Sequence, residues 1–151
     1  MEAFELLLHG GTCVTPAGVV RADVGISGGR IADVGALEAH PAAERLDATG
    51  LHLLPGVIDS QVHFREPGLT HKEDLGSGSA SAALGGVTCY FEMPNTQPST
   101  DSAERLGWKV ARAKETSWVD FAFYVGATRE NADRLGALER LLASLPACLK
   151  P

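Results

Sequence analysis

The spacing of hydrophobic and polar positions changes once along this chain, near Pro55. Before that point, short alternating runs at residues 4–8, 23–26, 30–34 and 51–54 are separated by glycines. Such alternation is typical of β-strands with one buried face, and Ser27-Gly28-Gly29 has the composition of a tight hairpin turn. We therefore predict that residues 1–54 form a small β-sandwich segment, with residues 37–47 as a surface connection.

After Pro55, apolar strand runs alternate with segments of helical length. The strands begin near Val57, Val87 and Val119. The first helix has a capping box at Thr70–Glu73 and ends before Gly85-Gly86, and the second begins at Asp101. Apolar positions share one face of the second helix (Ala103, Leu106, Val110, Ala113) and of a third (Leu135, Leu138, Leu142, Leu145). The pattern predicts an α/β region over residues 55–151, with about three βα units and a parallel sheet.

One predicted strand breaks the apolar pattern of a buried parallel sheet. Successive strand residues point to opposite faces, so strict alternation places Asp59, Gln61, His63 and Arg65 on one face. Burying such groups without partners would cost several kcal/mol each. A metal, a ligand or other charged strands could meet them, or the strand could lie at a sheet edge with a solvated face. The turn that follows, at the carboxyl end of the strand, is where α/β folds place their sites.

Composition excludes several classes of function. The chain has 151 residues and a net charge of −6, and its basic residues form no stripe, which argues against nucleic-acid binding. No apolar run approaches the roughly 20 residues of a membrane span, and the acidic start lacks the positive region of a secretory signal. Three cysteines without Cys-x-x-Cys spacing (Cys13, Cys89, Cys148) fit reduced, buried thiols. We predict a cytoplasmic protein.

Two blocks of sequence resemble the dihydroorotases, cyclic amidohydrolases of the amidohydrolase superfamily. The first is residues 54–74, which contain Pro-Gly-Val-Ile-Asp and Arg-Glu-Pro-Gly, and the second is residues 85–98, which contain Met-Pro-Asn-Thr. The resemblance implies the N-terminal part of a (β/α)₈ TIM-like barrel preceded by a small β-sandwich segment. It also implies reversible hydrolysis of the cyclic amide of dihydroorotate to N-carbamoyl-aspartate in pyrimidine biosynthesis. Hydantoinases and allantoinases share Pro-Gly-x-Ile-Asp but match the Arg-Glu-Pro-Gly and Met-Pro-Asn-Thr segments less well.

The resemblance also implies a role for each polar residue. His63 matches the second His of the family's metal-binding His-x-His pair, where zinc activates water and polarises the amide carbonyl. Gln61 stands at the first His position and is a weaker, neutral ligand, which puts zinc occupancy in question. Arg65 and Asn95 match the positions that bind the substrate carboxylate. Asp59 matches an acid that orients the site rather than binding the metal.

Two departures from the family leave alternatives open. Gln61 is compatible with a single-metal enzyme, a displaced metal, or a non-catalytic dihydroorotase-like subunit that supports aspartate transcarbamoylase. A complete barrel needs about 250 residues, far more than follow Gly56. We therefore expect the remaining metal ligands and the catalytic Asp beyond Pro151, and Lys150 not to be a ligand. The 151 residues alone should be inactive and prone to aggregation or association, as a homo-oligomer or with aspartate transcarbamoylase.

Overall fold

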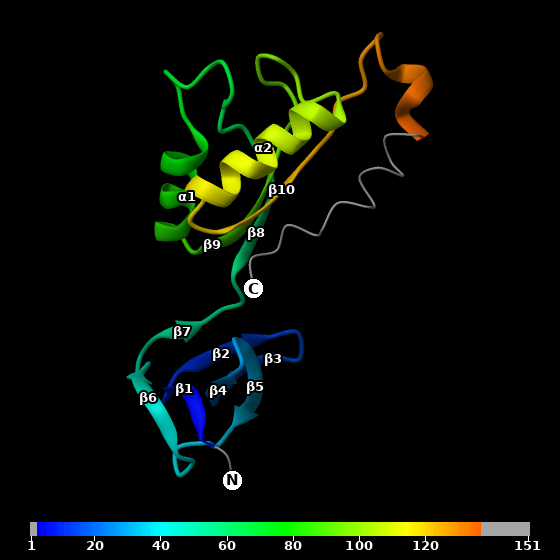
Figure 1. Ribbon diagram of the computed structural model, residues 1–151. Coiled ribbons are helices and arrows are strands. Elements are labelled where there is room, and N and C mark those ends of the chain that lie inside the picture. Colours follow the sequence, from blue (N-terminus) through cyan, green and yellow to red (C-terminus); the bar gives the residue numbers. More distant parts are fainter. Residues whose placement is uncertain (1–2, 137–151) are drawn as a thin grey trace. The chain divides into compact units, whose positions relative to one another are not determined.

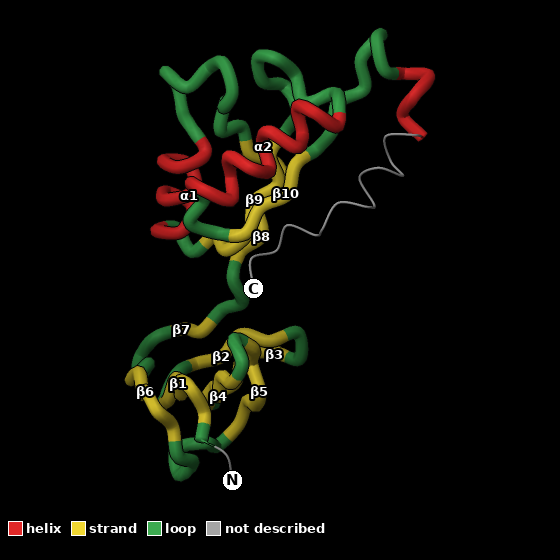
Figure 2. The backbone as a smooth tube through the Cα atoms, in the orientation of Figure 1, coloured by secondary structure: helices red, strands yellow, loops and turns green. Residues whose placement is uncertain are grey.

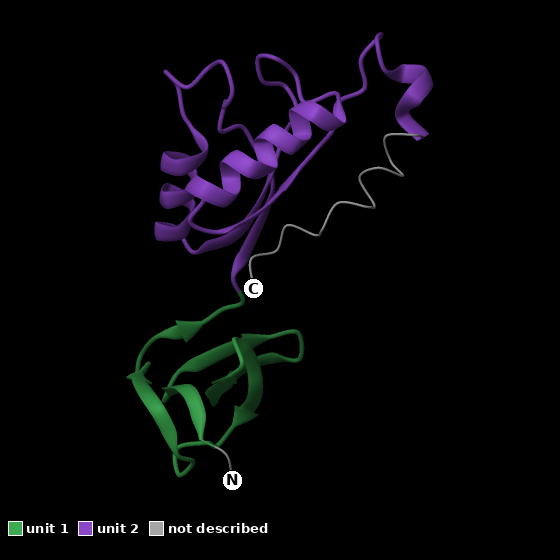
Figure 3. Ribbon diagram, in the orientation of Figure 1, with its two compact units in different colours: residues 1–55, 151 green, residues 56–150 purple. Residues whose placement is uncertain are grey.

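The computed structural model describes residues 3–136, and the polypeptide divides into two compact units at Pro55–Gly56 (Figures 1 and 3). The predictions for Leu138, Leu142, Leu145, Cys148 and Lys150 lie outside the described residues. Leu135, from the same predicted third helix, directly follows a single 3₁₀ turn, η1 (Ala132–Arg134). Within residues 3–136, no helix is long and apolar enough to cross a membrane.

Unit 1 consists of seven short strands in two sheets. They are β1 (Phe4–His9), β2 (Thr12–Thr15), β3 (Gly18–Arg21), β4 (Asp23–Ser27), β5 (Arg30–Gly35), β6 (Ala42–Asp47) and β7 (His52–Leu53). One sheet has the order β5-β4-β1-β6 and the other the order β3-β2-β7. The β4–β5 hairpin is confirmed: Gly28 and Gly29 both have positive φ, at 59° and 66°, as the tight turn requires.

Two features of unit 1 differ from the sequence-based expectation. The β2–β3 hairpin was not predicted, although Val14 and Val19 flank a Pro16-Ala17-Gly18 turn signal. The assignment of residues 37–47 as a surface connection is wrong, because Ala42–Asp47 form β6, which pairs in parallel with β1. The Ala and Glu content of this segment suggested a loop, but hydrogen bonding to a neighbouring strand overrides that local preference. The composition of the segment therefore did not predict its structure.

Unit 2 is a three-stranded parallel sheet with two helices. Its elements are β8 (Val57–Val62), α1 (Leu75–Leu84), β9 (Val87–Glu92), α2 (Ala103–Thr116) and β10 (Asp120–Phe123), and the strand order is β10-β9-β8 (Figure 2). Helix α1 contacts β9 and α2, and α2 contacts β10, so both helices cover one face of the sheet. The predicted strand–helix alternation and parallel sheet are confirmed.

The core of unit 2 lies between the helices and the sheet. Leu75, Tyr90, Ala113 and Phe121 are buried there, with Val62, Phe64, Val119 and Phe123 packed against them. Val62 and Phe64 therefore point toward the helices, as alternation from the predicted strand requires. The side chain of His63, which lies between them in sequence, therefore points away from the helices. This packing fixes the orientation of the carboxyl end of β8.

Both helices begin later than their sequence signals indicated. Residues 70–73 form turns, and Asp74 is the N-cap of α1, where its side chain accepts a hydrogen bond from Ser77 N at 2.8 Å. The capping box at Thr70–Glu73 is therefore wrong. Helix α2 is capped by Ser102, which accepts from Arg105 N at 3.3 Å, rather than by Asp101. In each case the residue that directly follows the predicted signal, Asp74 or Ser102, is an equally good N-cap. The sequence alone does not show which of the competing N-cap residues is used.

Candidate functional site

Strand β8 lies at an edge of the described sheet, and its side-chain alternation is interrupted. The register against β9 shifts between Asp59 and Val62, and Asp59 Oδ1 accepts a hydrogen bond from Gln61 N at 3.1 Å. The prediction of one unbroken polar face from Asp59 to Arg65 is therefore wrong, because an irregularity displaces the period of two. Within residues 3–136 the edge is open, and Ile58 is 62% exposed. Solvent thus reaches Asp59 and Gln61.

His63 and Asn95 are brought together by the ends of two adjacent strands. His63 follows β8 and Asn95 follows β9, and His63 Nδ1 lies 2.9 Å from Asn95 Oδ1. Because an amide oxygen only accepts, Nδ1 carries the proton, and the lone pair of the neutral imidazole lies on Nε2. The Asn95 amide group retains its N–H donors. His63 Nε2 could therefore bind a metal ion, and the Asn95 N–H groups beside it could donate hydrogen bonds to an anion.

Gln61 lies exposed on β8, and the structure pairs its side chain with neither His63 nor Asp59. No cluster of three His, Cys, Asp or Glu side chains able to hold a metal occurs among residues 3–136. His63 is therefore suited to supply one ligand, and this segment does not assemble a complete metal site by itself. Asp59 is engaged with the Gln61 backbone.

Arg65 has an unusual backbone conformation. Its φ is +68°, and it is the one residue other than glycine with positive φ in the described part of the chain. Its carbonyl accepts a hydrogen bond from Leu69 N at 3.1 Å, which closes the turn. At Gly68, with φ +89°, an added Cβ would lie 2.1 Å from the Gln97 carbonyl oxygen. The loops after β8 and β9 therefore touch, backbone to backbone, and a left-handed residue at a loop of this kind points to function.

The loop that carries Asn95 is held by its own hydrogen bonds. Thr96 Oγ1 donates to the Pro98 carbonyl at 2.9 Å, and Thr100 N donates to the Pro94 carbonyl at 2.9 Å. Gln97 N donates to the Pro67 carbonyl at 3.1 Å, which joins this loop to the Arg65 loop. Arg65, His63 and Asn95 thus share one rim at the carboxyl ends of β8 and β9, the end where α/β sheets place their sites.

A buried ion pair beneath this rim was not predicted from the sequence. Glu92, the last residue of β9, is 0% exposed, and its Oε2 lies 2.8 Å from Nζ of Lys109, whose side chain is 1% exposed. Neither oxygen of Glu92 has a partner with regular hydrogen-bond geometry, so the contact is an ion pair. Burial raises the pKa of Glu92 and lowers that of Lys109, while each charge partly opposes the shift of the other.

A signal for this pair was present in the sequence. Lys109 shares the apolar face of α2 with Leu106 and Ala113, and Glu92 is on the buried face of β9 with Tyr90. A charged residue on each of two otherwise apolar faces indicates that the two meet.

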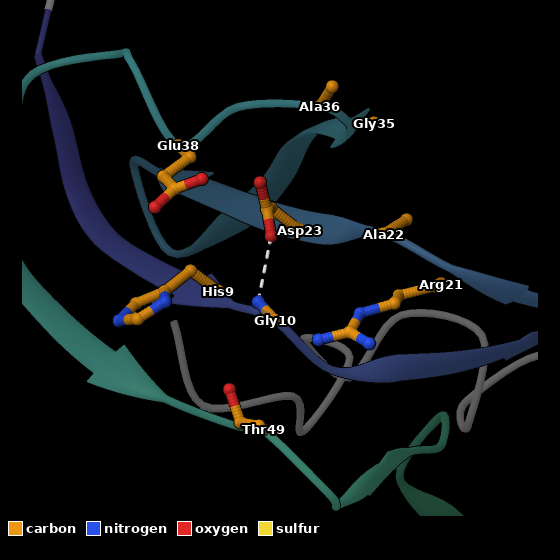
Figure 4. Close-up of a pocket in the computed structure, with 9 residues that line it drawn as sticks. All are labelled: His9, Gly10, Arg21, Ala22, Asp23, Gly35, Ala36, Glu38 and Thr49. Carbon is orange, nitrogen blue, oxygen red and sulfur yellow. Dashed lines mark hydrogen bonds between the residues drawn. The ribbon is translucent and has the colours of Figure 1, made fainter.

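A polar pocket lies in unit 1. It has a volume of about 400 Å³, and nine residues line it: His9, Gly10, Arg21, Ala22, Asp23, Gly35, Ala36, Glu38 and Thr49 (Figure 4). Its buried acid is already satisfied, because Asp23 Oδ1 accepts from Gly10 N and Oδ2 from Leu37 N, both at 2.8 Å. The Gly10 amide lowers the pKa of Asp23 more than any other partner does. This carboxylate serves the fold and is not free for a ligand.

Comparison with known proteins supports the cyclic amidohydrolase family that the sequence motifs indicated, without singling out the dihydroorotases within it. A family described as dihydro-orotase-like matches residues 50–141. The allantoinase of Deinococcus radiodurans is 44% identical over 137 residues, 90% of this chain and 31% of that protein. The dihydroorotase of Bacillus licheniformis is 40% identical over 115 residues, 76% of this chain and 27% of that protein. The chain thus spans about a third of the length of these relatives.

Solved structures agree on the fold. The L-hydantoinase (dihydropyrimidinase) from Arthrobacter aurescens superposes with a TM-score of 0.84 at 28% identity, covering 97% of this chain and 35% of that one. The predicted fold class is confirmed: the described residues form the N-terminal part of an α/β barrel hydrolase, with a small β-rich segment before it. The chain belongs to the dihydro-orotase-like family of cyclic amidohydrolases.

Proposed function

We propose that the full-length protein hydrolyses the ring amide of dihydroorotate, reversibly, to give N-carbamoyl-aspartate. The observation that carries this proposal is the rim formed by His63 and Asn95 beside the left-handed Arg65. Dihydroorotate bears a carboxylate next to its cyclic amide. A guanidinium and an amide donor at one rim suit such an anion, because Arg can bind a carboxylate through two parallel charge-assisted hydrogen bonds.

Each residue of the rim has a distinct task in this proposal. Arg65 binds the carboxylate, and Asn95 adds a donor while its oxygen holds the His63 tautomer. His63 keeps Nε2 available as a ligand, and Gln61 could add only a weak amide oxygen. If zinc is bound, it supplies Lewis-acid activation of water and of the amide carbonyl. The other ligands and the proton-transferring Asp would come from residues outside this segment.

A second candidate function is the hydrolysis of allantoin. It is supported by the 44% identity to the Deinococcus radiodurans allantoinase, slightly above the 40% to the Bacillus licheniformis dihydroorotase. Allantoin, hydantoins and dihydroorotate share a ring amide, but allantoin and hydantoin themselves lack the ring carboxylate. The role of Arg65 therefore separates the two proposals.

The test compares substrates in the full-length protein and in an Arg65→Lys variant. We expect kcat/KM to be highest for dihydroorotate. The substitution should lower kcat/KM for dihydroorotate by about 100-fold, since Lys cannot form the two-pronged contact, and leave that for allantoin within about threefold. A preference for allantoin that persists in Arg65→Lys would contradict the dihydroorotase proposal and support the second candidate.

A non-catalytic role as a subunit that supports aspartate transcarbamoylase is the alternative from another class. Metal analysis of the full-length protein, beside a Gln61→His variant, distinguishes it from an enzyme. Tightly bound zinc and turnover in the unmodified protein exclude the silent subunit, whereas zinc and turnover only in Gln61→His exclude the enzyme. We also propose that these 151 residues alone are inactive and that the protein is cytoplasmic. Enzyme-like turnover of dihydroorotate by the isolated 151-residue chain with added zinc would contradict the first statement.

A further inference from the structure

Two buried carboxylates lie at the strand ends from which the Arg65 loop and the Asn95 loop begin. Glu66 follows Arg65 in sequence, and its Oε1 accepts a hydrogen bond from Arg112 Nε at 2.7 Å. Glu92 ends the neighbouring strand, and its Oε2 lies 2.8 Å from Lys109 Nζ. Lys109 and Arg112 are three residues apart on α2, so they lie on the same side of that helix. One helix therefore supplies the counter-ions for both carboxylates.

Glu66 connects the Arg65 loop to both helices of unit 2. While Oε1 meets Arg112, Oε2 accepts a hydrogen bond from the backbone N–H of Leu75 at 3.0 Å. Leu75 is the first residue of α1 and is fully buried in the core. The residue next to Arg65 is thus fixed at two points by charge-assisted hydrogen bonds, the stronger kind in proteins.

Glu92 lies on the strand beside the one that leads to Arg65. It pairs in register with Val62, three residues before Arg65. Burial raises the pKa of the Glu92 carboxyl, and Lys109 and the Arg65 backbone amide oppose that shift. The Lys109 ammonium that pairs with Glu92 also lies 5.4 Å from the centre of the Phe123 ring, so it is fixed in turn by the core. The Arg65 carbonyl is engaged as well, because it accepts a hydrogen bond from Leu69 N.

We propose that Glu66 and Glu92, each with its cation from α2, are positioning residues that hold Arg65 in its left-handed conformation. A residue with a side chain adopts positive φ only where its surroundings enforce it. Here those surroundings are the anchored Glu66, the ion pair at the end of β9 and the closed turn. The conformation decides where the guanidinium points. Neither carboxylate touches the substrate. The inference rests on the proposed function, because it concerns the group that binds the substrate carboxylate.

The experiment measures binding and catalysis in the full-length protein. The variants are Glu66→Gln, Glu92→Gln and Arg65→Ala, with Asp101→Asn as a control, since Asp101 lies just before α2 and pairs with Arg105, whose side chain is 45% exposed. Binding is measured by calorimetry with orotate, the unsaturated analogue that retains the carboxylate. We expect Arg65→Ala to weaken orotate by about 100-fold and each Glu variant by about tenfold, with the control unchanged.

The kinetic pattern separates positioning from general damage. If Arg65 is displaced, KM for dihydroorotate should rise about tenfold in Glu66→Gln and Glu92→Gln while kcat stays within about threefold. A fall in kcat with KM unchanged would overturn the inference. Wild-type orotate affinity in both Glu variants, with Arg65→Ala weak, would also overturn it and leave the proposed function standing. Wild-type affinity in Arg65→Ala would instead overturn the proposed carboxylate recognition, and the inference with it.

A further variant covers the case in which Glu92→Gln does not fold. The double variant Glu92→Met/Lys109→Met replaces the ion pair by apolar side chains and leaves no buried unpaired charge. It should fold and still bind orotate about tenfold more weakly, because the strand end beside Arg65 has lost its buried ion pair. Full orotate affinity in this folded double variant would show that Glu92 does not position Arg65.

Discussion

Each of the two compact units buries a carboxylate, and the two are stabilised in opposite ways. In unit 1, Asp23 receives two backbone N–H groups at 2.8 Å, and its pKa is lowered. In unit 2, Glu92 is fully buried against Lys109, and burial raises its pKa despite the positive charge. The fold around Asp23 favours its charged form, whereas burial disfavours the charged form of Glu92 and Lys109 opposes that effect.

This difference shows which buried charge calls for a functional explanation. Backbone amides that would otherwise lack partners account for Asp23, which joins β4 to the ends of β1 and β5. A buried ion pair, by contrast, is often no more stable than apolar side chains of the same size. We therefore relate its presence at the end of β9, directly before Met93-Pro94-Asn95, to the proposed positioning of Arg65 rather than to stability. The comparison leads to four predictions.

The largest effect should come from removing one partner of the ion pair. Lys109→Met leaves Glu92 buried and unpaired, which should lower the free energy of unfolding of unit 2 by about 3–5 kcal/mol at pH 7. Because the pKa of Glu92 is already raised in the folded state, protonation relieves the defect, so stability is lost as pH rises. The loss in the variant should therefore shrink between pH 7 and pH 5 in urea unfolding. A defect that is independent of pH would mean that Glu92 is not the group left unpaired.

The matching change in unit 1 should be smaller and have the opposite pH dependence. Asp23→Ala removes two charge-assisted hydrogen bonds and should cost about 2–3 kcal/mol. The lowered pKa of Asp23 means that its contribution is present above its ordinary pKa of about 4 and is lost as pH falls below it. Wild type and variant should thus converge in acid. Asp33, an exposed Asp on β5, serves as the control and should change stability by less than about 0.5 kcal/mol when replaced by Ala.

A glycine substitution in each unit tests how closely the loops around that glycine are packed. Gly28→Ala has open space around the new Cβ, so it should cost only the left-handed conformation, about 1 kcal/mol. Gly68→Ala places its Cβ 2.1 Å from the Gln97 carbonyl oxygen and should cost about 2 kcal/mol, with loss of orotate binding. Thermal unfolding and calorimetry check both. Equal effects of the two substitutions would indicate that the loops after β8 and β9 separate readily.

The smallest effect is expected for a partly exposed ion pair at the start of α2, the helix that carries Lys109. Arg105 Nη1 lies 2.5 Å from Asp101 Oδ1 in an i, i+4 arrangement at the start of α2. Asp101→Asn should change stability by no more than about 0.5 kcal/mol, because water screens the charges. A loss as large as that of Lys109→Met would show that burial is not what distinguishes the two pairs.

The sequence predicted the elements whose signals are local. The change of period at Pro55, the β4–β5 hairpin and the parallel βα units depend on neighbouring residues, and all three are confirmed. Sequence-based prediction failed for features that depend on contacts with residues far away in the sequence. Strand β6 exists because β1 pairs with it, the helix starts depend on competing caps, and the shift between Asp59 and Val62 is set by the β9 register.

The candidate site follows the same rule. The sequence motifs identified His63, Arg65 and Asn95 as candidate site residues. Only the fold shows that His63 contacts Asn95, which is 32 residues away in sequence. The Glu92–Lys109 pair is formed by a strand and a helix that come together only after folding. Its two residues could have been flagged as charges on apolar faces, but their partnership is a tertiary contact.

The hydrogen bond between His63 and Asn95 also leaves only one nitrogen of the His63 imidazole free to react. With Nδ1 engaged, an acylating reagent such as diethyl pyrocarbonate can attack only at Nε2, the atom that faces away from Asn95. The exposed residues His52 and His71 provide internal references for the reaction rate in the same molecule. The labelling rate of His63 relative to theirs becomes a direct gauge of whether anything covers Nε2 when the whole protein is assembled.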